Sequence, residues 1–170
     1  VGLSAPSEAP DFDFRLPDHP VGPEAPRIAM YKSWQEPIPA GWQRWGFDEY
    51  EMPYDTLHDA DIRGGALSGY DVLLFQAQDA QSIREGYDQG ELPERYTGGL
   101  AHQGIAAVKA FVENGGRVIA IEAATEFVAD LFDLDISKST EGLSNTDFYI
   151  PGSILRLELD TSSQINQGMR

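Results

Sequence analysis

The stretch Asp71-Val-Leu-Leu-Phe75 decides the fold class, because it is a continuous apolar run directly after the turn Ser68-Gly-Tyr70. A strand buried on both faces of a sheet has this pattern, whereas a half-exposed strand alternates apolar and polar residues. A second run of the same kind is Arg117-Val-Ile-Ala-Ile121, and a shorter β-prone run is Arg27-Ile-Ala-Met-Tyr31. We therefore predict strands at residues 27–31, 71–75 and 117–121, the last two buried.

Helical patterns separate these runs. The sequence predicts one helix over residues 39–50 and another over residues 124–131. The clearest helix opens at Thr97-Gly-Gly99, with Thr97 as its cap, and ends at Asn114-Gly-Gly116. Its apolar stripe consists of Ala101, Ile105, Val108 and Val112. Farther along, residues 153–159 alternate like a strand with one exposed face.

Alternating strands and helices with continuous apolar strands predict an α/β fold, with a mostly parallel sheet between layers of helices. Ligands of such sheets bind beyond the carboxyl ends of the strands. The first three predicted strands end at Ser33 and Trp34, at Gln76, and at Glu122, so these residues are expected to line a cleft. Residues 77–97 form a long connection, which is typical of a functional or mobile loop.

Charge and composition exclude several classes of function. Asp and Glu number 28 against 12 Lys and Arg, which gives a net charge of −16 in 170 residues. Nucleic acids and anionic membranes bind mainly through Lys and Arg contacts with phosphate, so neither is an expected partner. The chain has no cysteine, which excludes a disulfide, a thiolate zinc site and a cysteine nucleophile. The sequence also lacks the G-x-S-x-G, G-x-G-x-x-G and H-E-x-x-H motifs.

Residues 1–26 differ in composition from the rest of the chain. They contain six of the eleven prolines and an excess of acidic residues. Proline fixes φ and removes a backbone donor, so this segment is predicted to be an extended interdomain linker, with the folded domain at residues 27–170.

Three other features each have more than one interpretation. Thr97 and Gly98 place backbone N–H groups at a predicted helix start, where they either bind an anion or, as we favour, only cap the helix. The aromatic residues between Trp34 and Tyr54 fit a ligand pocket, a protein interface or, for Trp42 and Trp45, core packing. The nearest approach to a metal site is Asp55, His58, Asp59 and Asp61, but their spacing is not diagnostic, and we predict a solvated, capped segment there and no metal.

Five short segments of the chain form a distinctive set: Ala29-Met-Tyr-Lys-Ser-Trp34, Gly41-Trp-Gln-Arg-Trp45, Asp61-Ile-Arg-Gly64, Tyr96-Thr-Gly-Gly-Leu100 and Phe148-Tyr-Ile-Pro-Gly-Ser-Ile-Leu-Arg156. Together they resemble the C-terminal domain of large bacterial zinc carboxypeptidases of the carboxypeptidase A superfamily. That domain resembles a class I glutamine amidotransferase, which implies a flavodoxin-like three-layer sandwich. The resemblance also implies that the fold continues past Arg170, so the sheet is expected to be incomplete at the C-terminus.

The resemblance breaks down at the catalytic position. An active amidotransferase carries its nucleophilic Cys in a turn between a strand and a helix, and Glu122 stands at the matching place in Ala120-Ile-Glu-Ala-Ala124. A carboxylate is a much poorer nucleophile toward an amide than a thiolate. Glutaminase activity is therefore not expected, and Glu122 is interpreted as a degenerate nucleophile position.

These observations predict a non-catalytic accessory domain of a zinc metallocarboxypeptidase-like protein. The implied zinc belongs to the peptidase domain, so no cofactor is expected in this chain. The expected partners are that peptidase domain and peptide substrate, and the resemblance implies a secreted or periplasmic location. The candidate cleft consists of Ser33, Trp34, Gln76, Thr97, Gly98 and Glu122. Two alternatives are an independent small-molecule hydrolase that uses Glu122 as general base, and a solvated interaction module.

Overall fold

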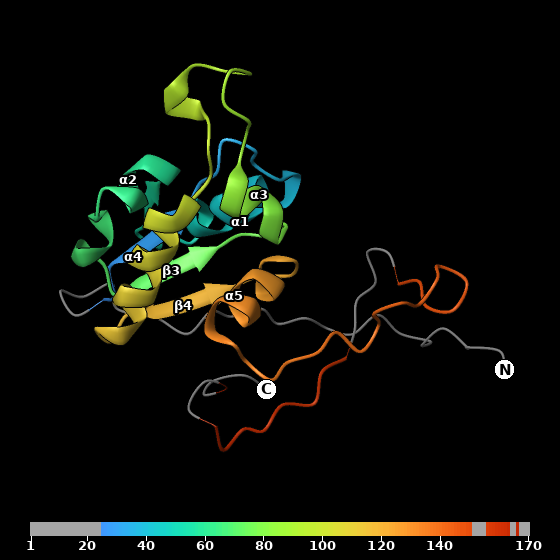
Figure 1. Cartoon of the computed structure of the whole chain (residues 1–170). Helices are drawn as coiled ribbons and strands as arrows, with labels where there is room; N and C mark the ends of the chain where they lie inside the picture. The colour runs from blue at the N-terminus through green and yellow to red at the C-terminus, as the bar shows by residue number, and fades with distance from the viewer. Residues whose placement is uncertain (1–24, 151–155, 164–165, 167–170) are drawn as a thin grey trace, which may run out of the picture. The chain divides into compact units, whose positions relative to one another are not determined.

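The three apolar runs form neighbouring strands of one all-parallel sheet, which confirms the α/β class (Figure 1). The computed structural model describes residues 25–150, 156–163 and 166. A fourth, very short strand completes the sheet in the order β2-β1-β3-β4. The strands are β1 (Ile28–Tyr31), β2 (Asp55–Leu57), β3 (Val72–Phe75) and β4 (Arg117–Ala120).

Helices follow every strand, and those predicted from the sequence are present with shifted ends. The helices are α1 (Ile38–Glu49), α2 (Asp59–Arg63), α3 (Ala80–Glu85), α4 (Ala101–Glu113) and α5 (Ala124–Phe132), with 3-10 turns η1 (Ala66–Gly69) and η2 (Glu94–Tyr96). In Figure 1, α4 and α5 lie in front of the sheet and α1 lies behind it. All of these elements belong to a compact unit that ends at Ser139, and residues from Thr140 onward are grouped separately.

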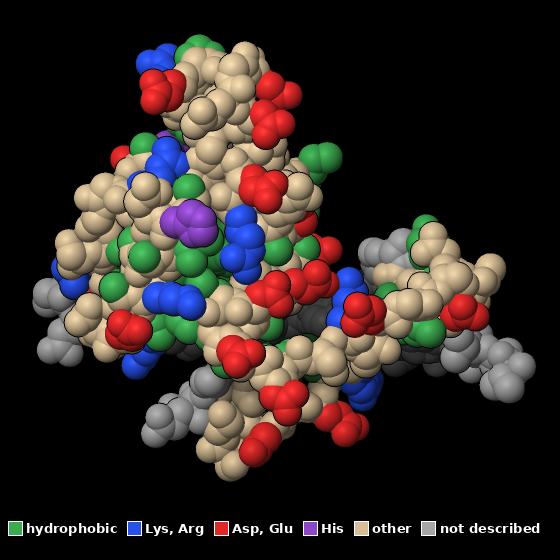
Figure 2. Space-filling view, in the orientation of Figure 1, with side chains coloured by type: hydrophobic (Ala, Val, Ile, Leu, Met, Phe, Trp, Pro, Cys, Tyr) green, Lys and Arg blue, Asp and Glu red, His purple; other side chains and the backbone are tan. Residues whose placement is uncertain are grey.

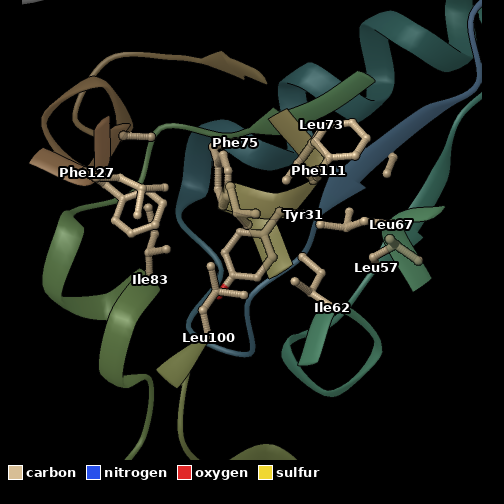
Figure 3. Packing of buried hydrophobic residues seen from close by; sticks show 14 residues of the cluster. Tyr31, Leu57, Ile62, Leu67, Leu73, Phe75, Ile83, Leu100, Phe111 and Phe127 are labelled. Carbon is tan, nitrogen blue, oxygen red and sulfur yellow. The ribbon is translucent and has the colours of Figure 1, made fainter. Parts of the chain in front are cut away.

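The main core lies on one face of the sheet. Tyr31 and Phe75 point to this face from the two central strands, and Phe127 of α5 packs against Phe75 (Figure 3). Successive side chains of a strand alternate between faces, so Met30 and Leu74 point to the opposite face. There the backbone carbonyl of Ala40 in α1 accepts a hydrogen bond from the Gln76 amide (3.2 Å). The first face is therefore built of apolar side chains, and the second is partly covered by α1.

One predicted strand occupies a different environment from the one expected. β4 pairs only with β3 and is the edge of the sheet within the described residues. Val118 and Ala120 pack against the core, but Arg117 and Ile119 on the other face are exposed, Ile119 by 48%. The prediction that this strand is buried on both faces was wrong, because an apolar run does not reveal which strand ends at an edge.

The prediction for residues 153–159 is also wrong where it can be compared. Residues 156–159 are exposed and form no strand, while residues 153–155 lie outside the described residues, as do residues 1–24 of the linker predicted at 1–26. The expected long loop at 77–97 contains α3 and η2. The residue that could have predicted α3 is Asp79, which caps this helix by accepting the N–H of Ser82 (2.9 Å).

The surface carries the acidic excess of the sequence: Asp and Glu side chains are scattered over the face shown in Figure 2. Within the described part of the chain, none of the helices has the length and apolar character required to span a bilayer.

Candidate functional site

The carboxyl ends of β1 and β3 form the switch point of this sheet, because the chain leaves β1 toward β2 on one side and returns to β3 on the other. Ser33 is buried after β1, and its Oγ accepts the N–H of Gln35 (3.0 Å). The Gln78 amide, which follows β3, donates to the carbonyl of Gln35 (3.2 Å). This bond ties the two strand ends together and fixes the backbone that presents Trp34.

Trp34 is the centre of an aromatic cluster at this end of the sheet. Its ring stacks in parallel on His58 (3.9 Å between centroids, 1°), and Tyr96 meets it edge-on (4.6 Å, 82°). Trp34 is 37% exposed, so the cluster is accessible from solvent. Arg95 lies over the Tyr96 ring at 4.4 Å. The cluster therefore offers an aromatic surface with a cation beside it, a combination that can stack against a ligand or peptide side chain.

The ring of His58 is held in one tautomer. Nδ1 lies 2.7 Å from the carbonyl oxygen of Lys32, and a carbonyl can only accept a hydrogen bond. Nδ1 therefore carries the proton of the neutral ring, which leaves the lone pair of Nε2 available as an acceptor. His58 can accept a hydrogen bond from a ligand that stacks against this cluster.

A buried polar pair lies beneath the cluster. The hydroxyl of Tyr31 donates to Oδ1 of Asp59 at 2.5 Å, and both residues are almost fully buried. Burial raises the pKa of Asp59, and this effect exceeds the opposing effects of the Tyr31 hydrogen bond and of Arg63. Burial, reinforced by the neighbouring carboxylate, also raises the pKa of Tyr31 well above its usual range. Tyr31 is thus a neutral donor at physiological pH.

Replacing Asp59 by Asn should change the pH dependence of stability. The carboxyl binds its proton more tightly in the folded than in the unfolded chain, so the wild-type protein loses stability as pH rises from about 4 through the raised pKa. The amide side chain of the Asp59→Asn variant would keep an acceptor for the Tyr31 hydroxyl without the buried charge. We expect the variant to melt higher than wild type at pH 7 and to lose this advantage toward pH 3.

Thermal unfolding followed by circular dichroism between pH 3 and 8 measures this difference. The control is Asp71→Asn, because hydrogen bonds from Arg27 lower the pKa of Asp71 to about 2. That change should have the opposite sign, with stability lost at pH 7 and the loss shrinking as pH falls below 4. Equal melting temperatures for Asp59→Asn and wild type at every pH would contradict the assignment of a costly buried carboxylate.

Neither the favoured helix cap nor the alternative anion site is formed at Thr97 and Gly98. Helix α4 begins at Ala101 and Thr97 does not cap it; instead its Oγ1 donates to the carbonyl of Glu94 (2.9 Å). The N–H of Gly98 donates to Tyr87 (2.9 Å) and that of Gly99 to Glu85 (2.6 Å). These N–H groups are used by the protein backbone, so both interpretations of this segment, helix cap and anion site, were wrong.

Gln76 and Glu122 lie apart from the aromatic cluster. Gln76 is buried, and its amide donates to the Ala40 carbonyl and contacts Sδ of Met30 (3.0 Å) on the other face of the sheet. Glu122 is exposed in the turn from β4 to α5, and β3 lies between β4 and β1. Its φ of 53° is left-handed, a conformation that costs a residue with a side chain about 1–3 kcal/mol. Its carboxylate forms no hydrogen bond or ion pair with any described residue.

The four residues considered for a metal do not converge. Asp59 binds Tyr31, whereas Asp61 accepts the N–H of His58 (2.8 Å) in a capping box at the start of α2. Asp55 accepts the hydroxyl of Tyr70 (3.1 Å). Among the described residues, no three His, Asp or Glu side chains are placed to hold a metal ion.

A pocket of about 970 Å³ lies at the opposite, amino end of the strands. It is lined by Arg27 and Asp71, which form an ion pair (2.8 Å), and by Phe111 at the end of α4. Because the charge of Arg27 is already paired with Asp71, this pocket offers less chemistry to a ligand than the aromatic cluster. We therefore place the candidate site at the carboxyl ends of β1 and β3.

Two residues of this site, His58 and Tyr96, have no signal in the sequence that places them beside Trp34. The sequence presents His58 only as a possible metal ligand and Tyr96 only as part of a family-like segment. Neither has a local pattern that predicts the stack on Trp34, because the three residues come from separate connections of the chain.

No protein-family profile, curated protein or solved structure matches this chain.

Proposed function

We propose that this chain is a non-catalytic accessory domain of a secreted or periplasmic zinc metallocarboxypeptidase-like protein, with a flavodoxin-like three-layer fold. The peptidase domain of the parent would supply the zinc and the hydrolytic chemistry. In this proposal the aromatic cluster of Trp34, His58 and Tyr96 contacts that domain or its peptide substrate. The strand order β2-β1-β3-β4 supports the fold, since flavodoxin-like sheets share this order over their first four strands.

The observation that carries the proposal is the backbone conformation of Glu122 together with its carboxylate side chain. The turn keeps a left-handed residue between a strand and a helix, as a nucleophile turn does, but the side chain is a carboxylate. Amide hydrolysis by a covalent route needs an activated nucleophile and a base within hydrogen-bonding reach. Among the described residues none bonds the Glu122 carboxylate. This supports loss of catalysis in an amidotransferase-like domain.

The test compares the parent protein with and without residues 27–170, assayed for release of C-terminal amino acids with zinc present. We expect kcat to be kept, and KM to rise severalfold or the melting temperature to fall. Within the intact parent, Trp34→Ala should raise KM without lowering kcat or unfolding the domain, and Trp45→Ala is the matched control because that exposed Trp lies on α1. Loss of kcat with zinc still bound would overturn the accessory role.

The strained φ of Glu122 also favours a second candidate, an independent small-molecule hydrolase with Glu122 as general base. The isolated chain is assayed for ammonia release from glutamine and for hydrolysis of a panel of small amides and esters. If wild type is active and Glu122→Gln reduces turnover by about a hundredfold or more, this candidate replaces the accessory role. If neither protein is active, or if both are equally active, the hydrolase candidate is excluded.

A further inference from the structure

Helix α1 carries large apolar side chains on its outer side, although the half-buried Phe47 on its inner side packs against Tyr54. Its inward-facing side includes Ala40, Gln43 and Arg44, of which only Ala40 is fully buried. Its outer side carries Ile38, 88% exposed, and Trp42, 71% exposed, followed by Trp45, 57% exposed. A helix that only covers a sheet turns its apolar stripe toward the core. The large side chains on the outside of α1 therefore contribute nothing to the core of this unit.

The outer residues form one continuous surface. Ile38, Gly41, Trp42 and Trp45 have the spacing i, i+3, i+4 and i+7, which places them on one face of a helix. The two Trp rings meet edge to face, with centroids 6.1 Å apart at 82°. A Cβ added at Gly41 would meet no atom within 4 Å. This outer face of α1 thus has two large rings beside a position without a side chain, where a second helix can approach closely.

The end of this face is acidic. Asp48, Glu49 and Glu51 are exposed at the C-terminus of α1, and the last turn contains no basic residue. A helix C-terminus already carries partial negative charge, so these carboxylates raise an unfavourable potential that a cation would relieve. Arg44 does not relieve it, because it pairs with Glu36, which precedes the other end of the helix. A partner whose charge complements this outer face is therefore basic.

We propose that the outer face of α1 is a docking surface for a basic amphipathic helix of a partner protein. Apolar residues of the partner would pack over Gly41 and cover Trp42 and Trp45. Its Lys and Arg residues would pair with the carboxylates that end α1 and stack on the Trp faces. A second copy of this chain is a poor occupant, because it brings another net charge of −16. Such a partner is independent of the peptidase domain proposed above.

The test measures binding of synthetic peptides to the whole 170-residue chain by calorimetry. The probes are a Leu/Lys peptide with helical spacing of its leucines, the same composition in scrambled order, and a Leu/Glu counterpart. We expect the patterned Leu/Lys peptide to bind most tightly and the Leu/Glu peptide not to bind. The double variant Trp42→Ala, Trp45→Ala keeps the net charge and should weaken binding about tenfold or more.

Two further variants test whether peptide binding depends on the outer face of α1 or only on the negative net charge of the chain. Gly41→Gln adds a long side chain at a position where a Cβ meets open space, so it should obstruct the close approach of a partner helix and also weaken binding about tenfold. Ile136→Ala removes a 69% exposed apolar residue outside α1 and should leave binding unchanged. Binding that is equal for scrambled and patterned peptides, or unaffected by the Trp and Gly41 variants, would overturn the proposal. So would sedimentation that shows a dimer of wild type that the Trp variant abolishes.

Discussion

Phe75→Ala should lower the free energy of unfolding by about 3–5 kcal/mol, one of the largest losses that a single substitution in this chain can cause. Phe75 is fully buried at the end of β3. Its ring contacts Tyr31 of β1 and Phe127 of α5, each with centroids 5.2 Å apart (Figure 3). Truncation removes the ring that connects two strands to a helix and leaves a cavity that none of these neighbours can fill.

Urea unfolding followed by circular dichroism measures the loss. Ile119→Ala is the matched control, because Ile119 lies on the adjacent strand but is 48% exposed, and it should cost about 1 kcal/mol or less. If Phe75→Ala does not fold, Phe75→Leu fills most of the space and should cost about 1–2 kcal/mol. Equal stability of Phe75→Ala and Ile119→Ala would contradict the placement of the core on one face of the sheet.

The elements that the sequence predicted are those whose pattern is local and long. β3 has four buried residues in succession, and α4 repeats an apolar stripe over 13 residues. β2 has only three residues and α2 only five, too few for either period to appear. These short elements acquire their structure from neighbours: β2 from pairing with β1, and α2 from packing against α4. Tertiary contacts, which a single sequence does not display, decide such segments.

The candidate site was predictable only at the strand ends. Ser33 and Trp34 follow β1, so their position is a consequence of the parallel sheet. His58 reaches Trp34 only because β2 lies beside β1, and β2 was not foreseen. The exposure of Trp42 and Trp45 was also hidden from the sequence, since their helical spacing fits a core face and an outer face equally well.

Gly99→Ala should be similarly damaging, with a cost of about 3 kcal/mol or more, although it adds only one methyl group. A Cβ at Gly99 would lie 2.5 Å from the carbonyl oxygen of Ile83 and 2.9 Å from two further backbone atoms of α3. These atoms cannot rotate away as a side chain does, so the two backbone segments must separate. Separation would break the hydrogen bond from the Gly99 N–H to Glu85 and the bond from Leu100 to Ile83 (2.9 Å).

Gly99→Ala should also disturb the candidate site, because Tyr96, which contacts Trp34, belongs to this same segment. We expect the tryptophan emission of Gly99→Ala to shift to longer wavelength at low urea, before global unfolding. Gly46→Ala is the control: a Cβ there meets nothing within 4 Å, and alanine should stabilise α1 by about 0.5–1 kcal/mol. A Gly99→Ala protein as stable as wild type would show that residues 98–100 do not pack against α3, and Tyr96 would then have no rigid support beside Trp34.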